Sequence, residues 1–396
     1  MALLAVDAAI ERILGGVAPL TRDVVRLEQA RGRVLAETLA ARLTQPPFDA
    51  SAMDGFAVRA SDVRKLPVRL AILGEAAAGH PFGGHVGPGE AVRIFTGAPV
   101  PDGADAIVIQ ENATIAGSTV TVTEGVPEAA NIRRRGYDFA AGSPLVSAGR
   151  RLGPRELALI AAMGHGSVPV FRRPRVAVLS TGDELVLPGE TPGPGQIVAS
   201  NHLGVAGLAE QAGAEVRFLG IAKDNATSIE HHVAEASDAD ILVTIGGASV
   251  GDHDLVAPVL ERRGLKLDFW KIAMRPGKPL MFGRLGDIRM LGLPGNPVSA
   301  LICSRVFLVP LIRALQGMPN GGDGVTAVRA AVALEANGPR QHYMRAVVRR
   351  GGDGAAEVAP VRSQDSSLLS PLAEADALIV RPPGAAAVPA GGIVSA

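Results

Sequence analysis

The chain has 396 residues, which at roughly 150 residues per domain predicts about two to four domains rather than one ordinary core. Lysine plus arginine and aspartate plus glutamate balance at 39 each, so no net charge draws the chain to nucleic acid or to a charged membrane. Aromatic residues are 3% of the chain, which argues against base-stacking platforms. A single cysteine, Cys303, excludes an intramolecular disulfide and fits a reducing compartment.

The N-terminal stretch predicts a short amphipathic helix. Apolar residues from Ala5 to Leu14 recur at helical spacing, and a Gly-Gly pair follows. Asp7 and Glu11 lie inside this stretch, which is wrong for a secretion signal, and no uninterrupted apolar run reaches about 18 residues. We therefore expect a soluble cytoplasmic protein with neither a membrane nor a nucleic-acid partner.

The next part of the chain predicts a β domain inserted in a helical linker region. Residues 31–41 are expected to form a second helix, after which QPPFDASAMDGFAV turns into an extended region. From about 55 to 146, short β-rich runs alternate with Gly and Pro turns. A helical stretch at 154–164 follows, and a basic link between two prolines ends near residue 174.

The second half of the chain predicts an α/β domain and a small β domain. The strand-like runs RVAVLS, EVRFLGIA, DILVTIGG and LKLDFWKIA alternate with helical patterns at 201–213, 226–237 and 253–263, as in a parallel sheet with helical crossovers. The predicted fold class is therefore multidomain α/β. Its division is a linker region at 1–45 and 147–174, a β-rich domain at 46–146, an α/β domain at 175–317 and a C-terminal β domain at 325–396.

Ligands of open α/β sheets bind beyond the carboxyl ends of the strands, so the loops found there are the first candidates for a site. In STGDEL, Gly182 permits a tight turn, and Asp183 and Glu184 place carboxylates beside the hydroxyls of Ser180 and Thr181. Such hard oxygen donors suit Mg²⁺. Taken alone, a tetrapeptide of this kind is more often a capped and solvated turn.

The loop TIGGASVGDHD follows the third strand and precedes a helix, which lets backbone amides approach a phosphate. Its small residues are Gly246, Gly247, Ser249 and Gly251, and Asp252 and Asp254 add carboxylates. The loop has neither the lysine of a Walker A motif nor GxGxxG spacing, so it is not an ordinary nucleotide site. Tight packing alone is an equally good explanation of its glycines.

Two further loops predict anion binding. Lys271, Arg275 and Lys278 surround a Pro-Gly turn, so their charges can converge on one oxyanion, although a solvated basic turn is the alternative. The segment GLPGNPVSA predicts a rigid turn with outward-pointing amides, formed by Pro294, Gly295, Asn296 and Pro297. No zinc spacing, GxSxG motif or reactive Cys-His pattern occurs, which disfavours covalent catalysis.

Six motifs in order resemble the signature of the molybdopterin molybdotransferases, the family of MoeA and the gephyrin E domain. They are SAMDGFAV (51–58), TGAPVPDGADAIVIQE (96–111), STGDEL, GGASVGDHD, PGKP and GLPGNPVSA, and SQDSSLLSPLAEADALI (363–379) is similar to the closing β domain of that family. The resemblance covers nearly the whole chain. It implies a homodimer with the active site between the α/β domain of one subunit and the β-rich domain of the other.

The resemblance also implies substrates and residue roles. The substrates would be adenylylated molybdopterin and molybdate, and the reaction would insert molybdate into the dithiolene and release AMP. The implied catalytic residues are Asp54, Thr96, Asp138, Glu184 and Asp254. The implied substrate-binding residues are Ser180, Thr181, Gly182, Asp183, Asp224, Gly246, Gly247, Ser249, Gly251, Pro294, Gly295, Asn296, Pro297, Ser366 and Ser367, and the implied oxyanion-binding residues are Lys271, Arg275, Lys278 and Arg345. Arg275 departs from a lysine seen in some members, which keeps the charge but changes its geometry.

Our hypothesis for the metal is that Asp54, Glu184 and Asp254 hold Mg²⁺ against the pyrophosphate, where the ion would neutralise charge on the leaving oxygen. Two alternatives to molybdate insertion are considered. Molybdopterin adenylyltransferases, which perform the preceding step and are a candidate partner, share the α/β domain; the flanking domains favour insertion. A scaffold resembling gephyrin is the non-enzymatic alternative, but the chain has no added adenylyltransferase domain or long linker.

Overall fold

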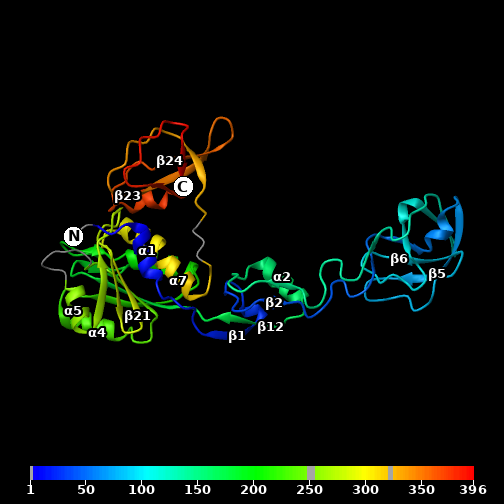
Figure 1. The fold of residues 1–396 in the computed structure, drawn as a ribbon, viewed down its shortest axis with the longest axis horizontal. Helices are drawn as coiled ribbons and strands as arrows, with labels where there is room; N and C mark the ends of the chain where they lie inside the picture. Colours follow the sequence, from blue (N-terminus) through cyan, green and yellow to red (C-terminus); the bar gives the residue numbers. More distant parts are fainter. Residues whose placement is uncertain (1–2, 248–254, 320–323) are drawn as a thin grey trace. The chain divides into compact units, whose positions relative to one another are not determined.

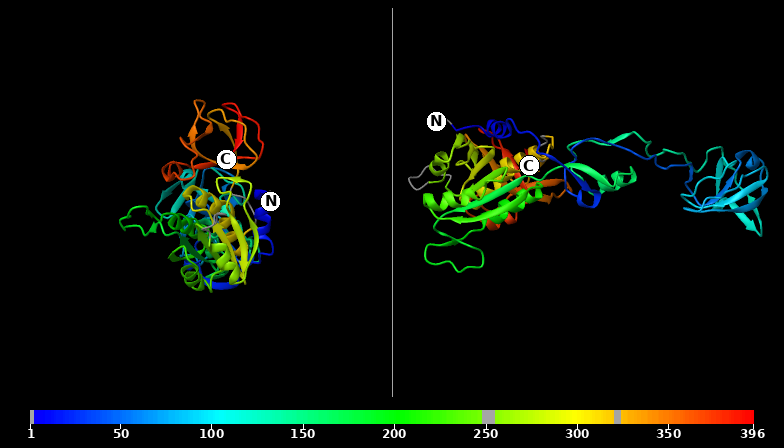
Figure 2. Two further views of the ribbon diagram at one scale, coloured as in Figure 1. Left: turned by 90° about the vertical axis from the view of Figure 1, so that its left-hand side faces the viewer. Right: turned by 90° about the horizontal axis from the view of Figure 1, so that it is seen from below.

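The computed structural model describes residues 3–247, 255–319 and 324–396 (Figures 1 and 2). The chain forms two compact units. The first comprises Met1–Asp23, Gly32–Ala36 and Pro169–Ala396, and the second comprises Val24–Arg31 and Glu37–Val168. The ranges predicted from the sequence divide the chain more finely than this, and they stay predictions.

The centre of the first unit is a six-stranded sheet in the order β16-β13-β17-β21-β20-β18. Its strands are β13 (Arg175–Thr181), β16 (Glu215–Ala222), β17 (Ile241–Ile245), β18 (Leu265–Trp270), β20 (Met281–Leu285) and β21 (Ile288–Leu293). Strands β16, β13, β17 and β21 pair in parallel with one another, whereas β20 pairs antiparallel with both β21 and β18. Every residue of β17 is buried, as expected of a parallel strand covered on both faces.

The sequence prediction was wrong for one edge of this sheet. LKLDFW forms the edge strand β18, which pairs antiparallel with β20 instead of with a parallel neighbour, and β20 and β21 were not predicted. Glycines inside the two missed strands weaken the β pattern of the sequence. They are required because a Cβ on Gly283 would lie 2.7 Å from the Lys266 carbonyl oxygen, and one on Gly292 would lie 2.6 Å from the methyl of Met281.

Helices cover both faces of the central sheet (Figure 1). They are α1 (Val6–Leu14), α3 (Asn201–Gln211), α4 (Ala226–Ala234), α5 (Val256–Arg262), α6 (Pro297–Cys303) and α7 (Val309–Leu315). Helices α1, α3, α6 and α7 bury apolar residues against one face, and α4 and α5 against the other. Helix α1 buries Val6, Ala9 and Ile13, whose spacing of three and four residues places them on one stripe.

Helices α6 and α7 are joined by a π-helical turn, η4 (Ser304–Leu308), just before Pro310. Proline has no N–H for the helical ladder, and a π turn is one way to accommodate it. The run Pro297–Leu315 is the one helix within the described ranges that is long and apolar enough to cross a membrane, with a mean hydropathy of 1.9. Since 67% of it is buried inside the protein, it has the character of a core helix.

The C-terminal part forms a second six-stranded sheet, in the order β19-β23-β24-β22-β26-β25, with β25 also pairing with β23. Its elements are β19 (Met274–Arg275), β22 (Ala327–Ala330), β23 (Gln341–Arg350), β24 (Ala356–Pro360), α8 (Leu369–Ala373), β25 (Ala377–Arg381) and β26 (Ile393–Ser395). Strand β19 comes from the middle of the α/β region and pairs in parallel with β23. The C-terminal sheet therefore includes the residues around the Pro-Gly turn.

An exposed excursion leaves the α/β region between β14 (Leu185–Val186) and β15 (Ile197–Val198), which pair in parallel. All residues from 187 to 198 are exposed, and this green segment stands away from the sheet in the right-hand view of Figure 2. It connects the STGDEL loop to helix α3. The excursion therefore begins and ends close to the candidate site.

The predicted helix at 31–41 was wrong. Gly32 has φ +74°, outside the helical region, and the following residues form β-bridges at 34–35, a bend at 36–37 and the short strand at 39–40. The Ala36 N–H donates to the Pro169 carbonyl at 3.0 Å, and Leu35 bridges Val170. Pairing with a partner far along the chain therefore overrides local helix propensity here. Short strands of this region are β1 (Arg22–Arg26), β2 (Leu39–Ala40), β11 (Pro144–Val146) and β12 (Ser167–Phe171).

The predicted helix near 154–164 is confirmed as α2 (Pro154–Ala162). Pro154 occupies its first turn, where a missing N–H costs nothing. The Glu156 carboxylate accepts the Gly153 N–H at 3.0 Å and so caps the helix start.

The second unit contains the mainly β domain, a sheet in the order β7-β4-β6-β5-β9-β8. Its strands are β4 (Gly55–Val58), β5 (Val68–Ala76), β6 (Glu90–Ile94), β7 (Ala106–Ile109), β8 (Ala113–Ala116) and β9 (Thr119–Val122), with β3 (Ala50–Ser51) and β10 (Ile132–Arg133) as a separate pair. Apolar side chains cover both faces of the sheet. The predicted fold class, α/β with β-rich domains on both sides of the α/β domain in the sequence, is confirmed.

One ion pair of the first unit is expected to matter for stability. The Arg172 guanidinium donates to both Asp240 carboxylate oxygens, at 2.6 and 2.8 Å, and the Arg175 N–H donates to the same carboxylate at 2.8 Å. The Asp240 side chain is 15% exposed. We expect Asp240→Asn to lower the free energy of unfolding by about 2 kcal/mol. The substitution removes the negative charge and one of the two oxygen acceptors that the mostly buried Arg172 guanidinium uses.

Urea unfolding of Asp240→Asn measures this loss. Asp238→Asn is the matched control, because the Asp238 side chain is 51% exposed and its ion pairs lie at the surface. Its effect is expected to stay below about 1 kcal/mol. Equal losses for the two variants would contradict the importance of the Arg172–Asp240 pair.

Candidate functional site

The candidate site of the first unit is the edge where the four parallel strands end. Neighbouring strand ends are joined by backbone hydrogen bonds: the Gly182 N–H donates to Ala222 at 3.1 Å, and the Gly246 N–H donates to Leu293 at 3.1 Å. The loops after β13, β16, β17 and β21 therefore meet at one edge. The sequence expected three such loops here, and the structure adds the loop after β21 as a fourth.

The loop after β13 carries buried hydroxyls and exposed acids. Ser180 and Thr181 are buried at the strand end, and Gly182 has φ +148°. A Cβ on Gly182 would lie 2.4 Å from a carboxylate oxygen of Glu184, so only glycine lets this carboxylate fold back over the turn. The carboxylate of Glu184 is exposed and free to meet a ligand.

Asp183 and Asp224 bind each other's loops. The Asp183 N–H donates to the Asp224 carboxylate at 3.4 Å, and the Asp224 N–H donates to the Asp183 carboxylate at 3.2 Å. The structure thus brings together two predicted substrate-binding residues from the ends of β13 and β16. Reciprocal bonding also supports the alternative considered from the sequence, in which Asp183 caps a turn.

The loop after β17 begins with Gly246 and Gly247, both at positive φ. A Cβ on Gly246 would lie 2.7 Å from the Thr181 carbonyl oxygen, and one on Gly247 would lie 2.3 Å from Val256. These glycines therefore permit close packing of the strand ends, which is the alternative to phosphate binding that the sequence left open. Ser249, Gly251 and Asp254 lie outside the described residues.

The turn after β21 is fixed from two sides. The Asn201 amide, at the start of α3, donates to the Gly295 carbonyl at 2.7 Å. The Asn296 amide donates to the Ser366 hydroxyl at 3.0 Å, and the Val298 N–H donates to the Ser366 carbonyl at 3.1 Å. The structure thus joins the predicted turn of residues 294–297 to the predicted Ser366, and it adds Asn201.

Ser367 lies beside this contact but is bonded elsewhere. Its N–H and hydroxyl both donate to Asp365, at 2.9 and 2.7 Å, which holds the pKa of the Asp365 carboxyl below its ordinary value. Of the two predicted serines, only Ser366 contacts the turn through a hydrogen bond of the described residues.

The basic turn places its three cations differently. The Ile272 N–H donates to Lys278 and the Lys271 N–H to Leu280, both at 3.0 Å, so Lys271 and Lys278 flank the base of one turn. Arg275 lies at the far side of the turn, in β19. Lys271 has φ +74°, a strained conformation for a lysine that hydrogen bonds must maintain. Leu4 supplies two of these hydrogen bonds: its N–H donates to the Lys271 carbonyl at 3.4 Å, and its carbonyl accepts the Ala273 N–H at 2.7 Å.

Below this turn lies the buried thiol of Cys303. Its sulfur is 3.8 Å from the Gly277 carbonyl oxygen, and burial raises the pKa of the thiol. A Cβ on Gly277 would lie 2.4 Å from the sulfur. The thiol is therefore inert, as expected from the sequence, and it supports the turn from below.

Arg345, predicted to bind an oxyanion, is almost fully buried, with 1% of its surface exposed. Its guanidinium donates to the carbonyls of Leu368 and Asp365, at 3.2 and 3.0 Å, and its backbone N–H donates to the side-chain oxygen of Gln364 at 3.0 Å. Arg345 therefore holds the loop that carries Ser366. Its predicted contact with an anion remains a prediction.

In the second unit the structure brings Asp54 and Thr96 together. One Asp54 carboxylate oxygen accepts the Thr96 N–H at 2.7 Å and the Thr96 hydroxyl at 2.8 Å. These bonds lower the pKa of the Asp54 carboxyl, and the positive charge of Arg93 adds to the effect. Arg93 itself lies over the rings of Phe56 and Phe95, 4.9 and 5.1 Å from their centroids.

Asp138 is exposed, and its described contact is the backbone bond from its N–H to the Gln45 carbonyl at 3.1 Å. No described hydrogen bond joins its side chain to Asp54 or Thr96. The nearby Arg134 and Arg135 are held by Asp49, whose carboxylate accepts from the Arg134 guanidinium at 2.6 Å and the Arg135 N–H at 2.7 Å.

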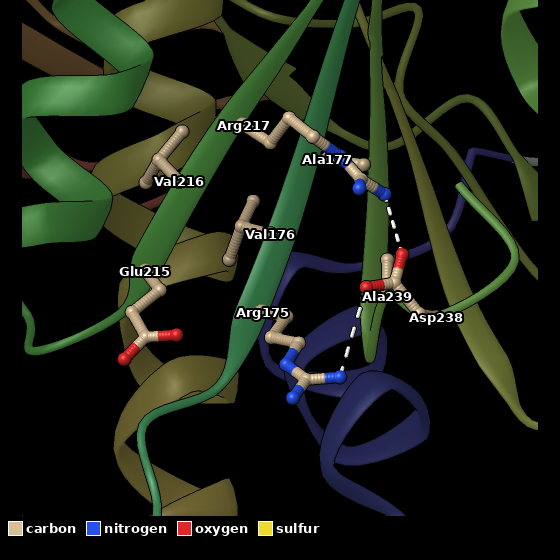
Figure 3. A pocket seen from close by; sticks show the side chains of 8 residues that line it. All are labelled: Arg175, Val176, Ala177, Glu215, Val216, Arg217, Asp238 and Ala239. Carbon is tan, nitrogen blue, oxygen red and sulfur yellow. Dashed lines mark hydrogen bonds and ion pairs between the residues drawn. The ribbon is translucent and has the colours of Figure 1, made fainter. Parts of the chain in front are cut away.

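A hollow of about 370 Å³ lies at the opposite, amino-terminal edge of the central sheet (Figure 3). Arg175, Glu215, Arg217 and Asp238 line it, and Asp238 forms ion pairs with both arginines. Since ligands of open α/β sheets bind at the carboxyl ends of the strands, this hollow is not the candidate site.

Sequence reasoning missed Asn201, Arg93 and His342, which lies beside Arg275 in the C-terminal sheet. Asn201 follows the exposed excursion and only the folded chain brings it to Gly295. Arg93 is one of 39 lysine and arginine residues, and no sequence pattern predicts that it lies over two aromatic rings. The alternating pattern QHYMR indicated a strand that contains His342, but not which residues lie beside it.

Three family models match successive parts of the chain: the MoeA N-terminal region (domains I and II) at residues 4–164, a probable molybdopterin binding domain at 177–314, and the MoeA C-terminal region (domain IV) at 327–396. The molybdopterin molybdenumtransferase of Haemophilus influenzae is 38% identical over 96% of this chain and 94% of its own. That of Bacillus subtilis is 34% identical over 96% and 90%.

A solved structure of the molybdopterin biosynthesis MoeA protein from Pyrococcus horikoshii is 31% identical, covers 100% of this chain and 99% of its own, and gives a TM-score of 0.81. The fold and these matches together place the protein in a class of multidomain transferases whose α/β domain resembles a molybdopterin-binding domain. The chain belongs to the molybdopterin molybdenumtransferase (MoeA) family of molybdenum cofactor biosynthesis.

The contact of Gly277 with Cys303 generates a stability prediction. We expect Gly277→Ala to destabilise the protein by about 1–3 kcal/mol, because the added methyl overlaps the buried sulfur at a positive φ. Thermal unfolding measures the loss. Gly286→Ala is the control, because Gly286 also has positive φ (+61°) but nothing within 4 Å of an added Cβ. If both changes destabilised the protein equally, the loss would come from backbone strain alone, and the contact with Cys303 would not contribute.

The contact of Thr96 with Asp54 generates a pH prediction. Thr96→Val removes one hydrogen bond and should raise the pKa of the Asp54 carboxyl toward its ordinary value of 3.8. Since the folded-state pKa is lowered, the contribution of Asp54 to stability is complete above the ordinary value and is lost as the pH falls through the folded-state value. Carbon NMR titration of the carboxyl measures the shift.

Thr123→Val is the matched control, because the Thr123 hydroxyl donates only to the Asn112 carbonyl, at 3.0 Å. It should leave the Asp54 titration unchanged. An unchanged Asp54 titration in Thr96→Val would refute the assigned role of the Thr96 hydroxyl.

Proposed function

We propose that the protein inserts molybdate into the dithiolene of adenylylated molybdopterin and releases AMP. The observation that carries the proposal is the joining of four strand-end loops, one of which is the turn of residues 294–297, and of Ser366 at one edge of the first unit. The names of relatives that match along more than nine-tenths of the chain support the reaction. Both flanking β regions match the same family, which favours insertion over the preceding adenylylation.

The edge has the chemistry to hold a pyrophosphate link. Backbone amides beside Gly246 and in the turn of residues 294–297 provide neutral donors, while Lys271 and Lys278 provide positive charge at the base of their turn. Molybdate is a tetrahedral oxyanion, and the two lysines are its proposed ligands in the first unit. Fixed donors of this kind stabilise charge that develops on a leaving oxygen.

We propose Mg²⁺ as the cofactor, with Glu184, Asp254 and Asp54 as ligands, because carboxylates are the ligands that this ion prefers. Among residues 3–247, 255–319 and 324–396, no three candidate metal ligands come together, and Asp254 lies outside these ranges. The described residues alone do not form a complete metal site. We therefore derive no step of the reaction through the ion.

The proposed assembly is a homodimer in the cytoplasm, with Asp54 and Thr96 of one subunit completing the edge that carries Glu184 in the other. The hydrogen-bonded Asp54 carboxylate is kept ionised by its partner Thr96, as a metal ligand must be. Molybdopterin adenylyltransferase is the proposed supplier of the substrate, because it forms the bond that this reaction cleaves.

The proposal is tested by incubating the full chain with adenylylated molybdopterin, Mg²⁺ and molybdate. AMP release and activation of an apo-molybdoenzyme are measured together. Molybdate-dependent production of both is the expected result. A folded protein that yields neither would overturn the proposal in favour of a scaffold, and formation of adenylylated substrate from ATP would identify an adenylyltransferase.

Replacing the exposed acid of the first loop gives a sharper prediction. We expect Glu184→Gln to reduce AMP release by about 10²–10⁴-fold with unchanged thermal stability, because the carboxylate is exposed and its loss removes charge, not packing. Asp254→Ala should reduce AMP release as well. Glu210→Gln, on the exposed side of α3, is the control and should retain activity. Full activity of Glu184→Gln would exclude Glu184 from the reaction.

A further inference from the structure

The peptide group between Gly295 and Asn296 is the exposed part of the turn of residues 294–297. Pro294 is buried at the end of the strand, whereas Gly295 and Asn296 are exposed. Among the hydrogen bonds between described residues, none uses the backbone N–H of Gly295 or of Asn296. The turn therefore presents two uncommitted N–H groups at the edge where the parallel strands end.

The side chain of Asn201 fixes the orientation of this peptide group. Its amide nitrogen lies 2.7 Å from the Gly295 carbonyl oxygen. A carbonyl oxygen only accepts hydrogen bonds, so the side-chain nitrogen of Asn201, and not its oxygen, faces it. The C=O and N–H of a planar trans peptide group point in opposite directions. The bond from Asn201 to the carbonyl therefore directs the Asn296 N–H away from helix α3.

Helix α3 carries Asn201 in its first turn, and that turn is held at two further places. A Cβ on Gly204 would lie 2.5 Å from a methyl of Leu301, so α3 and α6 approach closely there. The His202 ring stacks on the Phe218 ring of β16, with centroids 4.0 Å apart and planes at 14°. Because Asn201 and Gly204 are three residues apart, they lie on one side of α3. Packing on α6 thus brings Asn201 to the turn that precedes α6.

The bonds from the C-terminal region leave the Gly295 carbonyl untouched. Ser366 accepts the Asn296 side-chain amide at its hydroxyl and the Val298 N–H at its carbonyl. These two bonds hold the Asn296 side chain and the backbone after Pro297. Of the side chains that the structure describes, Asn201 is the one that bonds to the Gly295 carbonyl.

We propose that Asn201 is a positioning residue, which directs the Asn296 N–H at a phosphate oxygen of the substrate. This inference rests on the proposed function, which places the pyrophosphate link at this turn. A donor that is already oriented binds a charged oxygen without a rearrangement of the protein. In this assignment Asn201 does not touch the substrate and acts through the peptide group of the turn.

Kinetics of AMP release provide the first test. Asn201→Leu keeps the approximate size of the side chain and removes the donor. It is expected to raise KM for adenylylated molybdopterin about tenfold and to leave kcat within about twofold, because a hydrogen bond to a charged oxygen is lost equally from the bound substrate and the transition state. Asn201→Ser should give the same split, since its hydroxyl is too short to reach the Gly295 carbonyl.

Asn337→Leu is the matched control. The Asn337 amide also donates to backbone carbonyls, those of Arg340, Arg381 and Pro382, and it makes no described contact with the turn. This variant should keep KM and kcat at temperatures where it stays folded. An unchanged KM in both Asn201 variants, or an equal rise in Asn337→Leu, would overturn the inference.

Crystal structures provide a second test that does not depend on turnover. In Asn201→Leu the Gly295 carbonyl is expected to rotate or to adopt two orientations, because its fixed partner is gone. A carbonyl that kept its wild-type orientation would overturn the positioning role. If the wild-type protein released no AMP, the proposed function would fail, whereas a rotated carbonyl would still support the positioning role.

Wild-type crystals soaked in AMP test the ligand of the N–H group. A phosphate oxygen within hydrogen-bond distance of the Asn296 backbone nitrogen is the expected result. AMP that binds with its phosphate elsewhere would overturn the assignment of this N–H to the substrate.

Discussion

The common edge of four parallel strands is the constraint on which the rest of the first unit depends. Backbone hydrogen bonds from β16 through β13 and β17 to β21 hold the strand ends level with one another. In the loops after β13 and β17, Gly182 and Gly246 allow a close approach of neighbouring atoms that a Cβ would block. The positions of Glu184, Asp224, Gly246 and Gly295 are therefore consequences of the register of the sheet.

The C-terminal region is attached to this edge at two places. Ser366 contacts the turn after β21, and β19 continues the C-terminal sheet into the basic turn. Arg345 and Gln364 hold the loop of Ser366 in place from within the C-terminal region. Removing the C-terminal region would thus leave the turn of residues 294–297 and the basic turn without their neighbours.

The sequence predicted what short-range patterns encode. Alternation of strand-like runs with helical patterns gave the α/β region, and the ends of the predicted parallel strands gave three of the four loops. It did not predict β20 and β21, whose glycines allow packing against Lys266 and Met281. It also did not predict the non-helical conformation of residues 31–41, where Leu35 pairs with Val170.

For the site, the sequence indicated residue types but not their partners. It did not show that Arg345 is buried beneath the Ser366 loop, that Arg275 stands apart from the two lysines, or that Asn201 reaches Gly295. These relations depend on side chains that are distant in the sequence, and no local pattern carries them. The motif resemblance, by contrast, depends on the order of short segments, and the family matches confirmed it.

The sealed thiol of Cys303 has a consequence for the sulfur chemistry of the proposed reaction. Molybdenum binds thiolate readily, and a protein thiolate near the substrate would compete with the two dithiolene sulfurs for the metal. This chain has a single cysteine, and it is fully buried with its proton held in place by the surrounding apolar core. The protein therefore presents no exposed thiolate that would compete with the dithiolene for the metal.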